Sequence, residues 1–185
     1  MVTFDTAIKS DYKMGDSIKV AVLGGGSWAT ALVKMLCENL DKVGWYMRNT
    51  AAIAHIKEHQ HNPNYLSSVE FQVDQLYLSD DINEIVSYAN YLIFAIPSAF
   101  LHQELQKLTL PLTGKVVFSA IKGIVPEHGL IVGEYFHDLY QVPFDNIGVI
   151  TGPCHAEEVA LERLSYLTVA CSDEHKATVL AERLS

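Results

Sequence analysis

The sequence predicts an α/β fold, with a doubly wound, mostly parallel sheet that carries helices on both faces. Two observations predict it: strand-like and helix-like segments alternate along the chain, and the strand-like segments are almost wholly apolar. Strands that are apolar throughout are typical of a parallel sheet covered on both faces, and the helical segments supply the crossovers that parallel strands require. Ligands of such sheets bind at the carboxyl ends of the strands.

The first strand is expected at 18–23 and the first helix at 27–40. This helix is indicated by Trp28, Leu32 and Leu36, which recur at helical spacing. The later strands, each a short apolar run, are expected at 43–47, 91–96, 116–120, 147–151 and 166–171. The later helices, which connect them, are expected at 51–59, 80–88, 98–107, 129–140, 155–162 and from 173 to the end.

Local signals mark the breaks between these elements. Pro97 ends the apolar strand, Asp80 or Asp81 can cap the helix before it, and Pro63 interrupts regular structure in a polar stretch. No internal repeat or low-complexity linker divides the chain. We therefore expect one domain over 18–185, preceded by a loose N-terminal extension at 1–17.

Composition narrows the functional classes. The chain has 185 residues, 49% of them hydrophobic, which is enough for a substantial core. A net charge of −9 argues against a nucleic-acid-binding surface, which needs clustered Lys and Arg. Cys37, Cys154 and Cys171 are an odd number at wide spacings, which favours a reducing, cytoplasmic environment. No apolar stretch approaches the roughly 20 residues of a membrane span, and 1–17 are too polar for a signal peptide.

A glycine cluster joins the first strand to the first helix. Gly24, Gly26 and Ala29 fit the dinucleotide fingerprint G-x-G-x-x-A of a Rossmann-like fold. The pyrophosphate is expected on the amides of Ser27 and Trp28, where unpaired N–H groups and the helix dipole favour negative charge. The alternative is a glycine turn that simply ends a buried strand.

Two basic residues follow other strands of the expected sheet. Arg48 stands where a dinucleotide site specific for NAD commonly has a carboxylate, and no carboxylate stands beside it, so the sequence favours NADP or the use of both cofactors. Lys122 lies between an apolar strand and Gly123, and its ammonium is expected to reach the same crevice, where it can hold a phosphate or polarise a carbonyl. The alternatives are an exposed arginine and a solvated turn lysine.

Six motifs, taken together and in this order along the chain, resemble one protein family. They are GGGSWATAL (24–32), YMR (46–48), NPNYL (62–66), AIPS (95–98), KGI (122–124) and GPCHAEEV (152–159). The set resembles the N-terminal domain of bacterial NAD(P)-dependent glycerol-3-phosphate dehydrogenase, over nearly the whole chain from 18 onward.

The resemblance implies roles for particular residues. It places Ser27, Trp28, Arg48, Lys122 and Ala156 against the cofactor, with Phe100 near the nicotinamide side, in addition to Gly24 and Gly26 of the fingerprint. The residues that it places against sn-glycerol 3-phosphate are Lys122, Gly152 and Cys154, with Lys122 orienting the substrate. The family more often has Ser or Thr at position 154 and Phe at 155, so the hydroxyl contact to substrate at 154 is in question here.

The resemblance also implies a reaction: hydride transfer between NAD(P)H and dihydroxyacetone phosphate or glycerol 3-phosphate, which supplies a phospholipid precursor. Family members carry the proton acceptor, a second lysine, in a helical C-terminal domain beyond Ser185, and the full-length enzyme is a possible homodimer. Residues 1–185 alone are therefore expected to be inactive. The alternatives are another Rossmann dehydrogenase of a 2-hydroxy compound and a nucleotide-sensing module without chemistry.

Two remaining patterns have simpler interpretations. His55, Glu58 and His59 match the H-x-x-E-H order of some zinc proteases, but nothing else in the sequence suggests a protease, so we expect a solvated helix face and no metal. Cys154 precedes His155, but adjacent loop residues seldom point at each other, so we expect no nucleophile.

Overall fold

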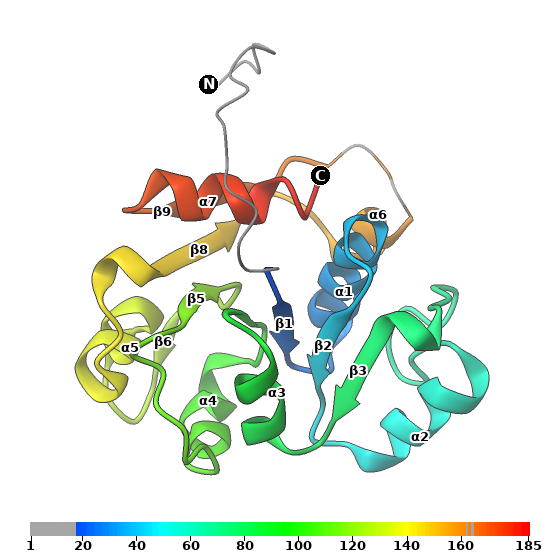
Figure 1. Ribbon diagram of the computed structural model, residues 1–185, viewed down its shortest axis with the longest axis horizontal. Helices are drawn as coiled ribbons and strands as arrows, with labels where there is room; N and C mark the ends of the chain where they lie inside the picture. Colours follow the sequence, from blue (N-terminus) through cyan, green and yellow to red (C-terminus); the bar gives the residue numbers. More distant parts are fainter. Residues whose placement is uncertain (1–17, 162, 164) are drawn as a thin grey trace.

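Seven strands form one sheet in the order β3-β2-β1-β4-β5-β8-β9 (Figure 1). The strands are β1 (Val20–Leu23), β2 (Val43–Tyr46), β3 (Leu76–Ser79), β4 (Tyr91–Phe94), β5 (Val116–Ser119), β8 (Ile147–Thr151) and β9 (Thr168–Cys171). All run parallel except β9, which pairs antiparallel with β8. The computed structural model describes residues 18–161, 163 and 165–185, so the extension expected at 1–17 lies outside the described residues.

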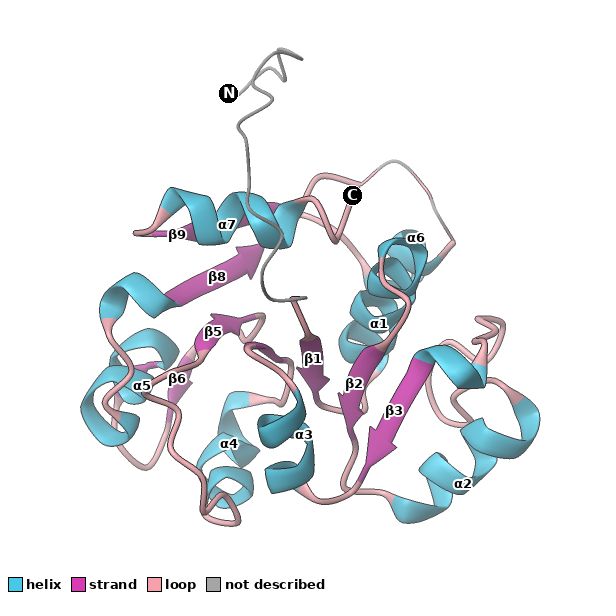
Figure 2. Ribbon diagram, in the orientation of Figure 1, coloured by secondary structure: helices cyan, strands magenta, loops and turns pink. Residues whose placement is uncertain are grey.

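Helices cover both faces of the sheet, as Figure 2 shows. They are α1 (Ser27–Asn39), α2 (Thr50–His59), α3 (Ile82–Tyr88), α4 (Ser98–Leu105), α5 (Val132–Tyr140), α6 (Ala156–Ala160) and α7 (Glu174–Ala181). Because successive side chains of a strand point to opposite faces, Val20 and Val22 of β1 pack with α1, while Ala21 and Leu23 pack with α3, α4 and α5. The predicted doubly wound, mostly parallel α/β fold is confirmed.

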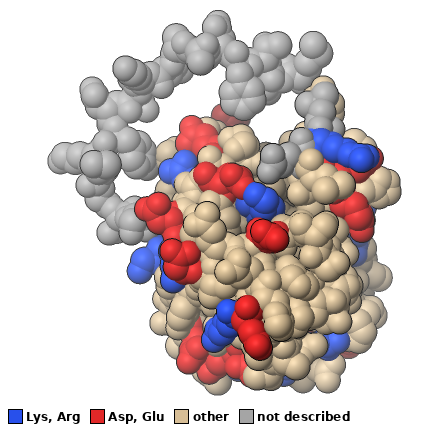
Figure 3. Space-filling model, turned by 90° about the vertical axis from the view of Figure 1, so that its right-hand side faces the viewer, with Lys and Arg blue, Asp and Glu red and all other residues tan. Residues whose placement is uncertain are grey.

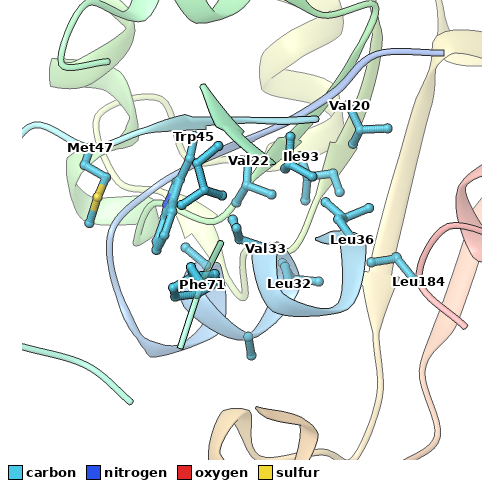
Figure 4. Packing of buried hydrophobic residues seen from close by; sticks show 14 of the residues in the cluster. Val20, Val22, Leu32, Val33, Leu36, Trp45, Met47, Phe71, Ile93 and Leu184 are labelled. Carbon is cyan, nitrogen blue, oxygen red and sulfur yellow. The ribbon is translucent and has the colours of Figure 1, made fainter. Parts of the chain in front are cut away.

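The core on the α1 side is built around aromatic residues of β2 and the loop before β3 (Figure 4). Trp45 is fully buried, and its ring centroid lies 5.3 Å from that of Phe71. Figure 4 places Leu36 and Leu184 toward the other end of the same cluster. Burial of each such side chain stabilises the fold by about 1.5–3 kcal/mol, so this layer holds α1 firmly on the sheet.

Strand β3 is absent from the sequence-based expectation. It has only four residues, and its buried Leu76 and Leu78 alternate with the partly exposed Tyr77 and with Ser79. An edge strand of this kind shows no continuous apolar run, which is the signal that identified the central strands. The short 3₁₀ turn Val73–Gln75 leads directly into it.

Two further differences lie in the second half of the fold. The helix expected at 129–140 begins only at Val132, because the antiparallel hairpin of β6 (Ile124–Val125) and β7 (Leu130–Ile131) occupies the preceding residues. The last strand, β9, reverses direction relative to its neighbour. An antiparallel edge strand is a common end to an otherwise parallel sheet, and alternation in the sequence carries no information about its direction.

The surface carries mixed charge. On the face seen in Figure 3, acidic and basic side chains are interspersed over an otherwise uncharged surface. Within the described part of the chain, no helix combines the length and apolar character that crossing a membrane would require.

The turn after β1 depends on a close backbone approach. Gly24 has a φ of +142°, and a Cβ at this position would lie 2.5 Å from the carbonyl oxygen of Ala95, just after β4. A real side chain essentially never comes so near a backbone atom. A residue with a side chain would also have to adopt, at this position, a backbone conformation that glycine alone adopts readily. Gly24 therefore lets the chain turn into α1 directly over the end of β4.

We expect Gly24→Ala to destabilise the fold by on the order of 3 kcal/mol, because the clash and the strained φ act together. Urea denaturation followed by circular dichroism measures the change. Gly26→Ala is the matched control: a Cβ there meets no atom within 4 Å, so its cost should stay below about 1 kcal/mol. Equal losses in the two variants would contradict the special role of Gly24.

Candidate functional site

Two pockets flank the glycine loop at the carboxyl ends of the strands. The β2–β4 pocket, of about 440 Å³, lies between the loop and the ends of β2 and β4. The β5–β8 pocket, of about 720 Å³, lies between the start of α1 and the ends of β5 and β8. The strand order reverses between β1 and β4, which is where doubly wound sheets bind their ligands. The two pockets therefore occupy the expected place for an elongated ligand.

Every site residue predicted from the sequence lines one of these pockets. Gly24, Gly26, Arg48 and Phe100 line the β2–β4 pocket. Ser27, Trp28, Lys122, Gly152, Cys154 and Ala156 line the β5–β8 pocket. The structure thus brings together residues from five separate segments of the chain, in two groups that meet at the glycine loop.

Side chains from other elements hold the glycine loop in place. The Trp45 indole Nε1 donates a hydrogen bond of 2.7 Å to the Gly24 carbonyl. The fully buried Asn62 donates through Nδ2 to the Gly25 carbonyl at 3.3 Å and to Thr30 Oγ1 at 2.9 Å, and Thr30 Oγ1 donates to the Gly26 carbonyl at 2.9 Å. Sequence reasoning noticed Asn62 only as part of a motif. In the sequence, Asn62 is only a polar residue directly before Pro63, and this local pattern does not predict a hydrogen bond to the distant glycine loop.

The open face of Gly26 is the clearest sign that this edge of the sheet can accept a ligand. Gly26 has an extended backbone, with φ −84° and ψ −177°, which any residue adopts. A Cβ there would meet nothing within 4 Å, so neither conformation nor packing requires glycine. The first N–H groups of α1, which begin at Ser27, have no acceptor within the helix and favour an anion. This open space fits a pyrophosphate that approaches the backbone closely.

Arg48 lies at the mouth of the β2–β4 pocket. Its side chain is 60% exposed, and its guanidinium carbon lies 5.3 Å from the centroid of the Phe100 ring. Its Nη1 lies 3.8 Å from Oε1 of Glu104, a residue of α4. The expectation that no carboxylate stands beside Arg48 is therefore wrong. It considered only neighbours in the sequence, whereas the carboxylate reaches Arg48 from a different element.

Glu104 is a buried carboxylate, only 3% exposed. Its Oε2 accepts hydrogen bonds from the Tyr46 hydroxyl at 2.6 Å and from Lys107 Nζ at 2.9 Å. Burial alone would raise the pKa of Glu104, but the hydrogen bonds from Tyr46 and Lys107 and the positive charges of Lys107 and Arg48 outweigh it, so the pKa lies below its usual value. Burial and the bond to Glu104 raise the pKa of Tyr46.

In the β5–β8 pocket, Lys122 is an exposed side chain just after β5. Gly123 follows it with a φ of +90°, which turns the chain toward the β6–β7 hairpin. The Cys154 thiol donates to the Tyr166 carbonyl at 3.0 Å, a structural contact that uses its proton. The pocket therefore offers the ammonium of Lys122, from the loop after β5, and backbone polar groups from the loop after β8.

The histidines of α2 cluster outside both pockets. The ring centroids of His55 and His59 lie 4.3 Å apart, and His55 Nε2 lies 3.4 Å from Nε2 of His61. Across residues 18–161, 163 and 165–185, no group of three or more His, Cys, Asp or Glu side chains is placed to hold a metal ion.

Comparison with known proteins agrees with this geometry. The family model described as NAD-dependent glycerol-3-phosphate dehydrogenase N-terminus matches residues 19–177. The chain belongs to this family. The glycerol-3-phosphate dehydrogenase (NAD(P)+) of Lysinibacillus sphaericus is 35% identical over 158 residues, which cover 84% of this chain and 46% of that protein. The corresponding protein of Ectopseudomonas mendocina is 33% identical over 155 residues, which cover 84% and 45%.

Solved structures of glycerol-3-phosphate dehydrogenases share the fold. The enzyme of Coxiella burnetii superimposes with a TM-score of 0.77 at 24% identity, covering 91% of this chain and 51% of that one. The enzyme of Dunaliella salina gives a TM-score of 0.79 at 21% identity, covering 91% and 32%. The chain spans about half the length of the curated relatives it matches. The resemblance seen in its six motifs is confirmed.

In this glycerol-3-phosphate dehydrogenase domain, the lowered pKa of Glu104 predicts a loss of stability in acid. Ionised Glu104 stabilises the fold above its unfolded-state pKa, and this contribution disappears as the pH falls through the lower folded-state pKa. We expect the difference in unfolding free energy between wild type and Glu104→Gln to shrink as the pH falls from about 7 to about 3. Urea denaturation across this range measures it.

The exposed Glu70, which lines neither pocket, supplies the control. Glu70→Gln makes the same chemical change, and its stability difference from wild type should not vary in this way. A Glu104→Gln difference that stays constant with pH would show that the carboxylate is not held ionised by its neighbours.

Proposed function

We propose that the chain is the cofactor-binding portion of an sn-glycerol-3-phosphate dehydrogenase. The intact enzyme would transfer a hydride between NAD(P)H and dihydroxyacetone phosphate or glycerol 3-phosphate. The open face of Gly26 at the start of α1, between two pockets at the reversal of strand order, carries this proposal. Membership of the family supports the choice of substrate over another 2-hydroxy compound.

Each pocket takes one half of the cofactor in this proposal. The α1 amides bind the pyrophosphate, the β2–β4 pocket holds the adenosine half beside Arg48, and the β5–β8 pocket holds the nicotinamide half. Trp28 and Ala156 border the nicotinamide half. Phe100, expected near the nicotinamide side, instead lines the β2–β4 pocket beside Arg48, so this proposal places it against the adenosine half. When bound, the cofactor supplies or accepts the hydride.

Lys122 is the substrate-orienting residue of the proposal. It is an exposed cation that lines the β5–β8 pocket, where it can hold the substrate phosphate or the oxygen at the reacting carbon. Gly152 and Cys154 border the substrate on the β8 side. The proposed proton acceptor is the second lysine of the family's helical domain, and a positioned base typically contributes about 10²- to 10⁴-fold to the rate. Residues 1–185 would therefore bind the cofactor without turning over substrate.

We also propose that NADP is the preferred cofactor. Arg48 is exposed at the pocket mouth, and its planar guanidinium suits a 2′-phosphate. The relatives are named for both NAD and NADP, so this preference is the finer part of the proposal.

The glycine loop provides the first test. We expect Gly26→Val to abolish binding of NADH and NADPH, because the side chain fills the open space at the start of α1, while the fold remains intact. Isothermal titration calorimetry measures binding, and circular dichroism checks the fold. Gly26→Ala should give a smaller loss. A folded Gly26→Val variant that still binds either dinucleotide would show that the pyrophosphate does not bind at this loop.

Arg48 provides the second test. We expect wild type to bind NADPH more tightly than NADH, and Arg48→Ala to weaken NADPH binding at least about tenfold while changing NADH binding much less. The same titrations measure this selectivity. Equal affinities in wild type, or equal losses for both cofactors in the variant, would exclude Arg48 as the source of the preference.

A further inference from the structure

Glu104 lines the β2–β4 pocket, and the proposed function leaves its carboxylate unused. It is a carboxylate with 3% exposure, and it nevertheless lines the pocket together with the glycine loop and Arg48. Buried carboxylates are costly unless they are paired, so the structure has to provide partners for this one.

The two oxygens of Glu104 have different surroundings. Oε2 accepts hydrogen bonds from the hydroxyl of Tyr46 and the ammonium of Lys107, and these bonds fix the carboxylate in place. Oε1 accepts no hydrogen bond from any residue that the structure describes, and Arg48 Nη1 lies 3.8 Å from it. That separation exceeds an ordinary hydrogen bond, so Oε1 keeps the capacity to accept one from a ligand.

Helix geometry places Glu104 and Phe100 around the same guanidinium. They occupy positions i and i+4 of α4, so their side chains lie on one face of the helix. Phe100 lies against the Arg48 guanidinium, and Glu104 approaches it through Oε1. A cation for a phosphate and an acceptor for a hydroxyl therefore stand side by side at the pocket.

These two groups favour different ligands. The 2′-hydroxyl of a ribose donates a hydrogen bond to a carboxylate, and for this reason many dinucleotide folds place Asp or Glu after the second strand. A 2′-phosphate has only acceptor oxygens and negative charge, so the same carboxylate repels it. In this chain the residue after β2 is basic, and the carboxylate comes from α4.

We propose that Glu104 is a specificity-determining residue, which accepts a hydrogen bond from the ribose of the cofactor's adenosine half and limits the preference of Arg48 for a 2′-phosphate. The Arg48–Glu104 pair then lets one pocket accept both NAD and NADP. This inference rests on the proposed function, because it requires the adenosine half to occupy the β2–β4 pocket.

Binding of two adenosine fragments tests the proposal without any turnover. The fragments are 5′-AMP, which has a free 2′-hydroxyl, and 2′,5′-ADP, which carries the 2′-phosphate. Isothermal titration calorimetry gives the ratio of their dissociation constants for wild type, Glu104→Gln and Glu70→Gln. We expect Glu104→Gln to shift this ratio at least about fivefold toward 2′,5′-ADP, by weakening 5′-AMP and strengthening 2′,5′-ADP. Glu70→Gln should leave the ratio unchanged.

A second variant protects the test against misfolding. The double variant Tyr46→Phe, Glu104→Leu replaces the buried hydrogen-bonded pair with apolar side chains of similar size, which folds often tolerate, and the same shift in ratio is expected. NADH and NADPH titrated against the same variants should shift in the same direction.

The outcomes separate the inference from the proposed function. A ratio that stays at the wild-type value, or an equal weakening of both fragments, would show that Glu104 only supports Tyr46 and would overturn the inference alone. If wild type bound none of 5′-AMP, 2′,5′-ADP, NADH and NADPH, the proposed function would be overturned, and the inference with it.

Discussion

The close contact between Gly24 and the backbone of Ala95 is the constraint on which the ligand-binding edge depends. β1 and β4 are neighbours, and the chain that leaves β1 must turn directly over the end of β4 to enter α1. A side chain at this point would push the loop away from the sheet. Because glycine allows the contact, the start of α1 lies at the reversal of strand order, with a pocket on each side.

A glycine loop has no side chains with which to fix its own shape, so other parts of the fold provide the hydrogen bonds. Trp45, Asn62 and Thr30 bond to its carbonyl groups, which leaves the amides at the start of α1 free to face a ligand. Among the described residues, no fully buried side-chain nitrogen or oxygen lacks a hydrogen-bond partner. These hydrogen bonds hold the loop in one conformation without any contribution from a ligand, and such preorganisation lowers the entropic cost of binding.

The sequence predicts the features that depend on local pattern. The apolar runs locate β1, β4 and β5, the spacing of Leu32 and Leu36 locates α1, and the placement of Lys122 between an apolar strand and a glycine locates it at the β5–β8 pocket. The sequence does not predict features that depend on contacts between distant segments. Neither the bond from Asn62 to the glycine loop nor the approach of Glu104 to Arg48 has a local signature. Edge strand β3 lacks a continuous apolar run, and the two-residue strands of the β6–β7 hairpin are too short for periodicity to reveal them.

The position of Leu184 has a consequence for how the domain assembles. This side chain, 5% exposed, completes the same apolar layer as Val20 and Leu36, and Asn39 at the end of α1 bonds to the backbone of Ser185. The layer over α1 thus joins the first and last described segments, which gives it a high contact order and a slow closure. During synthesis, α1 emerges from the ribosome long before Leu184, although β1 and β2 are already close to it in the chain. The part of its apolar face that Leu184 later covers is exposed in that interval, and exposed apolar surface favours aggregation.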